Sequence, residues 1–128
     1  MATQIVIANG DSILLDNSFN ILWADKGNAM PALPDTVHYV IWNDLTGQNE
    51  IQSKDPSTGM MTGNTDLNAT SDAVGSTTIA ALLTWGETRK GQIEAAETAY
   101  DTAVADDENN GTNNAEGKTW RDYDSNYS

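Results

Sequence analysis

His38 and one acidic loop are the parts of this sequence whose residue types come closest to a reactive or metal-binding site. His38 is the only histidine, and it stands in the apolar run His38-Tyr39-Val40-Ile41-Trp42. A catalytic triad needs a histidine beside a nucleophile and an orienting acid, and no serine here lies in a nucleophile motif. We therefore expect His38 to lie on the polar face of a strand, and we expect no enzyme activity.

The acidic loop that begins at Asp106 has part of the spacing of a calcium-binding loop. Gly111 fits the position of the sharp turn, but Glu108 is one methylene too long for its position. Gly117 stands where the bidentate carboxylate is needed. The chain also has no cysteine, which excludes disulfides and thiolate metal sites. The sequence predicts no metal site and no cofactor.

Aromatic residues close to the C-terminus indicate a tail that docks. Trp120, Tyr123 and Tyr127 are spaced at three and four residues, whereas disordered tails are usually poor in aromatic residues. Aromatic side chains bury much area with few rotatable bonds, so they often anchor protein interfaces. We expect these three side chains to contact a neighbouring subunit.

The element before this tail is a long predicted helix, from about residue 77 to 106, capped by Ser76 or Thr77. At about 1.5 Å per residue it would span roughly 45 Å, which is more than a three- or four-stranded sheet can cover. We therefore expect part of the helix to project or to pair with another chain.

The apolar seam of this helix leaves two alternatives. Residues at spacings of three and four approach a heptad pattern, although Gly86 and Arg89 interrupt it. In one alternative the helix packs on its own sheet through Ile79, Leu82, Leu83 and Trp85. In the other it associates with another chain, and the predicted interface then consists of Ile79, Leu82, Ile93, Tyr100, Trp120, Tyr123 and Tyr127.

The first half of the chain predicts β-hairpins. Asn9-Gly10 separates the β-branched run at residues 5–7 from a return strand at residues 13–15, and Asn-Gly accepts the positive φ of a tight turn. Alternation predicts a further strand at residues 18–23. The run at residues 37–42 predicts another strand, and the five-residue turn at residues 43–47 predicts its return strand at residues 48–52. Residues 53–75 predict a loop, with a short helical turn near residues 65–67.

The predicted fold class is therefore α+β, a small antiparallel sheet of hairpins followed by one long C-terminal helix and an aromatic tail. Residues 1–75 form the β-rich part, and residues 76–128 form the helix and the docking tail.

The charge of the chain bears on its partners. Nineteen acids and six bases give a formal net charge of −13, which repels nucleic-acid phosphates and anionic lipid. No run approaches the roughly 20 apolar residues of a membrane span, and the N-terminus lacks signal-peptide features. We expect a protein made in the cytoplasm that binds neither nucleic acid nor membrane. The charge serves solubility or adaptation to salt, or it matches a basic partner surface.

Four segments within residues 34–103 resemble small proteins of tailed bacteriophages, particularly those of marine and cyanobacterial hosts. They are His38-Tyr39-Val40-Ile41-Trp42-Asn43, Gly47-Gln48-Asn49-Glu50-Ile51-Gln52, Thr62-Gly63-Asn64-Thr65-Asp66-Leu67 and Leu82-Leu83-Thr84-Trp85-Gly86-Glu87-Thr88-Arg89-Lys90. The layout is also similar to tail-fibre assembly proteins and small fibre-associated modules.

The resemblance implies a virion or tail-assembly role that works by association, so it carries no active-site residues. We expect a structural protein of the tail, the tail fibre or the capsid surface, with other virion or tail proteins as partners and a homo-oligomeric state. One alternative is a tail-fibre assembly chaperone that does not remain in the particle. Another is a small carbohydrate-binding module, which would need Trp23, Trp42 or His38 in a pocket.

Overall fold

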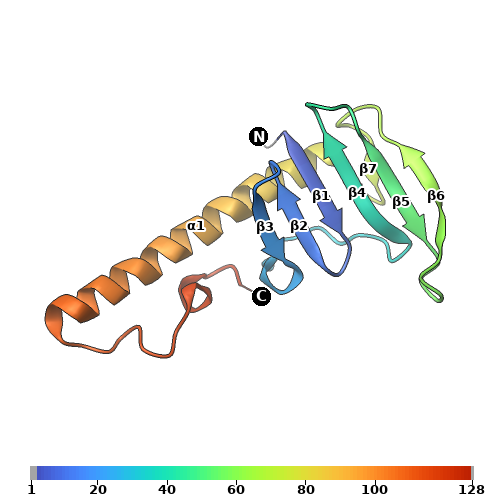
Figure 1. The fold of residues 1–128 in the computed structure, drawn as a ribbon. Helices are drawn as coiled ribbons and strands as arrows, with labels where there is room; N and C mark the ends of the chain where they lie inside the picture. The colour runs from blue at the N-terminus through green and yellow to red at the C-terminus, as the bar shows by residue number, and fades with distance from the viewer. Residues whose placement is uncertain (1–2, 128) are drawn as a thin grey trace.

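A six-stranded antiparallel sheet and one long helix dominate the computed structural model, which describes residues 3–127 (Figure 1). The α+β class predicted from the sequence is confirmed. The strand order is β3-β2-β1-β4-β5-β6. The strands are β1 (Gln4–Ala8), β2 (Ser12–Leu15), β3 (Phe19–Leu22), β4 (Val37–Asn43), β5 (Glu50–Lys54) and β6 (Met61–Asp66). The remaining elements are η1 (Trp23–Asp25), β7 (Ala73–Val74), β8 (Thr77–Thr78), α1 (Ile79–Asn110) and η2 (Trp120–Tyr123), where η marks a 3-10 turn.

The first two hairpins form because their turns carry residues that tolerate positive φ. Gly10, between β1 and β2, has φ +85°. Asp16 and Asn17, between β2 and β3, have φ values of 49° and 59°, which short polar side chains accept better than most. The third strand ends one residue earlier than the alternation predicts, since Trp23 begins η1.

The hydrophobic core lies between one face of the sheet and the first half of α1. Alternate residues of the strands point toward the helix, and they are buried because the helix covers them. The buried strand residues include Ile5, Ile7, Ile13, Leu15, Ile21, Val40 and Trp42, and the helix contributes Ile79, Leu82, Leu83, Trp85 and Ile93. The helix therefore packs on its own sheet, the first of the two alternatives derived from the sequence.

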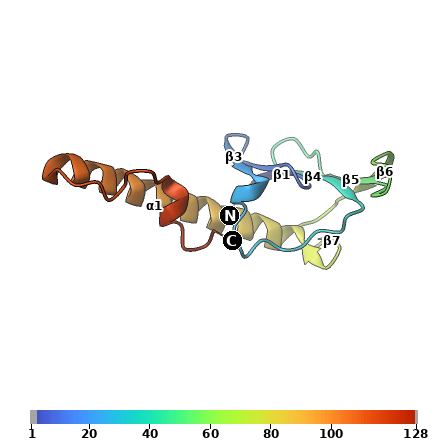
Figure 2. The same cartoon turned by 90° about the horizontal axis from the view of Figure 1, so that it is seen from below.

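α1 runs from Ile79 to Asn110, so it begins about two residues later and ends about four residues later than predicted. Thr78, and not Ser76 or Thr77, caps it, and its side chain accepts a hydrogen bond from the N–H of Ala81 at 3.1 Å. The helix ends at Gly111, which has φ +66°. Its second half extends past the sheet (Figures 1 and 2), so the expected projection is present.

The prediction of a loop over residues 53–75 is wrong, because β6 lies within it. Thr65 and Asp66, expected in a helical turn, belong to this strand, and Thr65 pairs with Ile51 of β5. Every residue of β6 is exposed, so the strand carries no apolar alternation that a sequence pattern would reveal.

Candidate functional site

The C-terminal tail returns along α1 and packs against its own chain (Figure 2). The rings of Tyr100 on α1 and Tyr123 on η2 meet edge-on, with centroids 6.0 Å apart. The rings of Trp120 and Tyr127 meet in the same way at 6.5 Å. The aromatic spacing of the tail thus produces contacts within the chain.

Two arginine–aspartate pairs hold this tail in place. Arg121 of η2 donates to both carboxylate oxygens of Asp25, at 2.7 and 2.8 Å. Arg89 of α1 pairs with the carboxylate of Asp124, and both side chains are buried. The Nε of Arg89 also donates to the backbone carbonyl of Asp25 at 3.0 Å. One network therefore joins α1, η1 and the tail.

The carboxylate of Asp124 stays charged in this buried place. Burial by itself would raise the pKa of Asp124, but hydrogen bonds from Arg89 and from the N–H of Asn126, with the charge of Arg89, lower the pKa below its usual value. The hydrogen bond to Asp25 likewise raises the pKa of Arg121. The carboxylate of Asp124 and the guanidinium of Arg121 are therefore charged near neutral pH.

The structure divides the seven residues of the predicted interface into two groups. Ile79, Leu82 and Ile93 are buried in the core of their own chain, so contact with another chain through them would require the helix to leave its sheet. This part of the predicted interface is corrected, because the sheet already covers the same seam. Tyr100, Trp120, Tyr123 and Tyr127 gather where the tail meets α1, and all four are half-buried.

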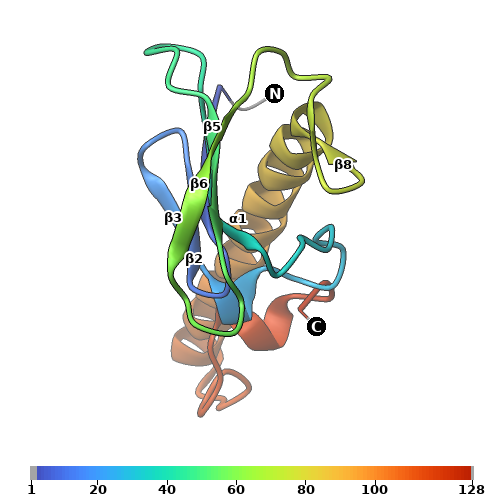
Figure 3. The same cartoon turned by 90° about the vertical axis from the view of Figure 1, so that its right-hand side faces the viewer.

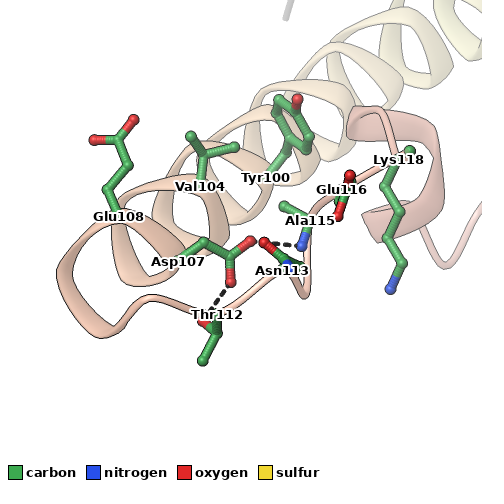
Figure 4. Close-up of a pocket in the computed structure, with 10 residues that line it drawn as sticks. Tyr100, Val104, Asp107, Glu108, Thr112, Asn113, Ala115, Glu116 and Lys118 are labelled. Atoms are coloured by element: carbon green, nitrogen blue, oxygen red, sulfur yellow. Dashed lines mark hydrogen bonds between the residues drawn. The ribbon is translucent and has the colours of Figure 1, made fainter.

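Three adjoining hollows follow the junction of α1 and the tail. The outermost is lined by Tyr100, Val104, Asp107 and Lys118, among others (Figure 4). The middle one lies between Tyr100 and Trp120 and also carries Glu97, Asp101 and Thr119. The innermost borders β3, and its lining is Phe19, Asn20, Ile21, Leu22, Asp25, Ile93, Glu97, Trp120 and Arg121.

Asp107, in the outermost hollow, organises the turn after α1 (Figure 4). Its carboxylate accepts hydrogen bonds from the Thr112 hydroxyl at 2.7 Å and from the N–H groups of Asn114 and Ala115 at 2.9 and 2.7 Å. The hydrogen bond from Thr112, followed by the one from Ala115, lowers the pKa of Asp107. These three hydrogen bonds give the carboxylate of Asp107 a structural role in the turn. Within residues 3–127 there is no group of three or more His, Cys, Asp or Glu side chains placed to hold a metal ion.

The outer face of the sheet is a second surface of interest, because α1 lies on the opposite face (Figure 3). Leu14, Val6 and Ile41 stand side by side on β2, β1 and β4, since Val6 pairs with both of the others. All three are half-buried, and Leu22 on β3 is 52% exposed. The sequence pattern did not single out this apolar row.

Of the three residues considered for a sugar pocket, His38 and Trp42 lie on β4 and Trp23 lies on η1. Trp42 is buried in the core, and its indole N–H has no hydrogen-bond partner among residues 3–127. Trp23 begins η1, and the ring of His38 lies against that of Tyr39 at 4.4 Å. These side chains do not form a shared aromatic platform.

Comparisons of the chain with protein-family models, curated proteins and solved structures found no match. Over the described part of the chain, no helix has the length and apolar character needed to span a membrane.

Proposed function

We propose that this chain is a structural protein of a tailed-bacteriophage virion, in the tail, the tail fibre or the capsid surface, and that it acts by association. The observation that carries the proposal is the uncovered apolar row formed by Leu14, Val6 and Ile41. A sheet face normally buries its apolar side chains, and exposed apolar patches mark association sites.

A second copy of this chain fits the outer face, because the centre of that face carries no charge. Beside Ile41 the row continues to Glu50 on β5 and Asp66 on β6, so its acids lie on the β5 and β6 side, and the uncharged part of the row lies on β2, β1 and β4. Two such faces can meet without burying like charges, despite the net charge of −13. We propose a homo-oligomer built through this face, with other virion proteins bound elsewhere.

The virion assignment is further supported by the sequence resemblance to small virion and tail-fibre proteins and by the form of the molecule. A sheet that presents one open face and a helix that projects from it suit a component that joins neighbours. In such a role the binding surfaces do the work, and no reactive group is required.

Light scattering coupled to size-exclusion chromatography tests the association surface. The double variant Val6→Gln/Ile41→Gln should shift the protein toward the monomer, because amide groups would have to be desolvated in the interface. Leu45→Gln is the matched control, since Leu45 is 82% exposed in the loop after β4. A wild-type protein that is monomeric at all accessible concentrations would overturn the self-association.

Mass spectrometry of purified virus particles tests the virion role. The proposal requires the protein at a stoichiometric copy number, and the Val6→Gln/Ile41→Gln variant should be incorporated less efficiently. Absence of the wild-type protein from the particles would instead favour a tail-fibre assembly chaperone.

A further inference from the structure

The hollow beside β3 runs along the open edge of the sheet. β3 is the terminal strand, with β2 as its one neighbour in the sheet. Phe19, Asn20, Ile21 and Leu22 all line the hollow. Because consecutive strand residues point to opposite faces, a hollow lined by four in succession must follow the backbone edge.

The backbone of Asn20 and Leu22 faces this edge. The N–H of Trp23 donates to the carbonyl of Asp11, on the β2 side, at 2.9 Å. Trp23 and Asp11 continue the register in which Leu22 pairs with Ser12. Hydrogen-bonded and non-hydrogen-bonded pairs alternate along an antiparallel ladder. Leu22 and Asn20 fall at the non-hydrogen-bonded positions, so their N–H and C=O groups point away from β2.

The far wall of the hollow combines apolar and acidic side chains. Ile93 and Trp120 supply apolar surface, and Glu97 supplies a carboxylate for which the described residues provide no ion-pair or hydrogen-bond partner. Two nearby cations, Arg121 and Lys90, are engaged. Arg121 pairs with Asp25 and stacks on Trp120, and Lys90 lies over the ring of Phe19.

We propose that the edge of β3 accepts an extended segment of another protein as an added strand, with lysine or arginine side chains directed at α1. Backbone groups of Asn20 and Leu22 would pair with the segment, as in other cases of strand addition. A long basic side chain can lay its stem on Ile93 and Trp120 and bring its cation to Glu97.

The opposite side chains of the added strand would extend the outer face beside Leu22. That face is apolar, so the segment should alternate basic and apolar residues. The net charge of −13 also favours a basic partner over a second copy at this edge. The inference goes beyond the proposed self-association, because it concerns a different surface and a different partner.

A fluorescently labelled octapeptide of alternating lysine and valine is the probe, with binding followed by anisotropy. We expect the wild-type protein to bind it. We also expect much weaker binding of the same peptide with alternate backbone nitrogens methylated, since methylation removes the pairing donors and leaves the charge. Equal binding of both peptides would show attraction by charge alone and would overturn the proposal.

Leu22→Pro is the matching change on the protein. Leu22 has φ −66°, the angle that proline requires, so the substitution removes the outward N–H without straining the backbone. Leu22→Pro should bind the probe about tenfold more weakly than Leu22→Ala, which keeps that N–H. Equal affinities would contradict strand addition, and the methylated peptide still decides the question if the proline variant fails to fold.

The side-chain preference has its own control. Glu97→Gln should weaken binding about threefold, as expected for one partly exposed charge pair. Asp106→Asn changes the net charge equally but lines none of the three hollows, so it should have no comparable effect. The Val6→Gln/Ile41→Gln variant should bind the peptide normally, so failure of this inference and failure of the proposed function are distinguishable.

Discussion

Arg89 and Asp124, 35 residues apart in the chain, form a buried ion pair that fastens the C-terminal tail to the first half of α1. Gly27 lies against the same guanidinium, since a Cβ there would come within 2.8 Å of the Arg89 Nε. The pair therefore sits where α1, the tail and the segment after η1 converge.

Removing one partner of this pair should destabilise the protein strongly. Asp124→Leu leaves the Arg89 guanidinium buried without its counter-ion, which typically costs about 3 kcal/mol of unfolding free energy. Urea unfolding at neutral pH measures the loss. Asp101 is an exposed acid on α1, the helix that carries Arg89. Asp101→Asn should therefore change the unfolding free energy little. Similar losses in both variants would contradict the role given to the pair.

The same pair predicts a dependence of stability on pH. Folding lowers the pKa of Asp124, so the unfolded state takes up its proton first as the pH falls. The contribution is complete above the ordinary aspartate pKa of about 3.9 and is lost as the pH falls through the lower, folded value. Asp124→Asn should be less stable than the wild type at neutral pH. Between neutral and acid pH, its urea midpoint should therefore fall less than the midpoint of the wild type. Parallel pH profiles would argue against a lowered pKa.

Gly86 and Gly91 should respond in opposite directions to alanine. A Cβ on Gly86 would lie 2.6 Å from Leu15 Cδ2 in the core, so Gly86→Ala should cost about 2 kcal/mol of stability by overpacking. Gly91 is exposed on the same helix with nothing within 4 Å of its added Cβ. Gly91→Ala should raise stability by about 0.5–1 kcal/mol. Thermal or urea unfolding of both variants gives the comparison.

Replacing Trp120, Tyr123 and Tyr127 together by alanine should loosen the tail without unfolding the sheet. The three rings pack against α1 and each other, whereas the main core lies between the sheet and the first half of α1. Hydrogen exchange should quicken over residues 112–127 and remain slow in β1 and β4. Tyr39→Ala, on the outer face, should leave exchange in the tail unchanged. Quickened exchange throughout the sheet would show that the tail supports the whole fold.

Local patterns were sufficient to predict most of the sheet and the helix. Turn residues such as Gly10, the β-branched runs and the apolar periodicity of α1 are all readable within short windows. β6 escaped prediction because a polar edge strand gains its order from pairing with β5, which no local pattern records.

The candidate site was only partly predictable for a related reason. The aromatic spacing predicted that Trp120 contacts a neighbouring subunit, but the neighbours that the structure gives it come from β3, α1 and η2 of its own chain, which the fold brings together. Arg89, read as an interruption of an apolar seam, is instead buried against Asp124. A pairing of residues so distant in sequence leaves no signal in a single chain.

The placement of α1 behind the sheet has a consequence for how copies would repel one another. The helix lies on the face of the sheet opposite to the outer face, and a packed layer is about 10 Å thick. This exceeds the screening length of about 8 Å in physiological salt. The charges of α1 should therefore contribute little to the ionic-strength dependence of association through the outer face, which is left to the acids of the face itself, Glu50 and Asp66.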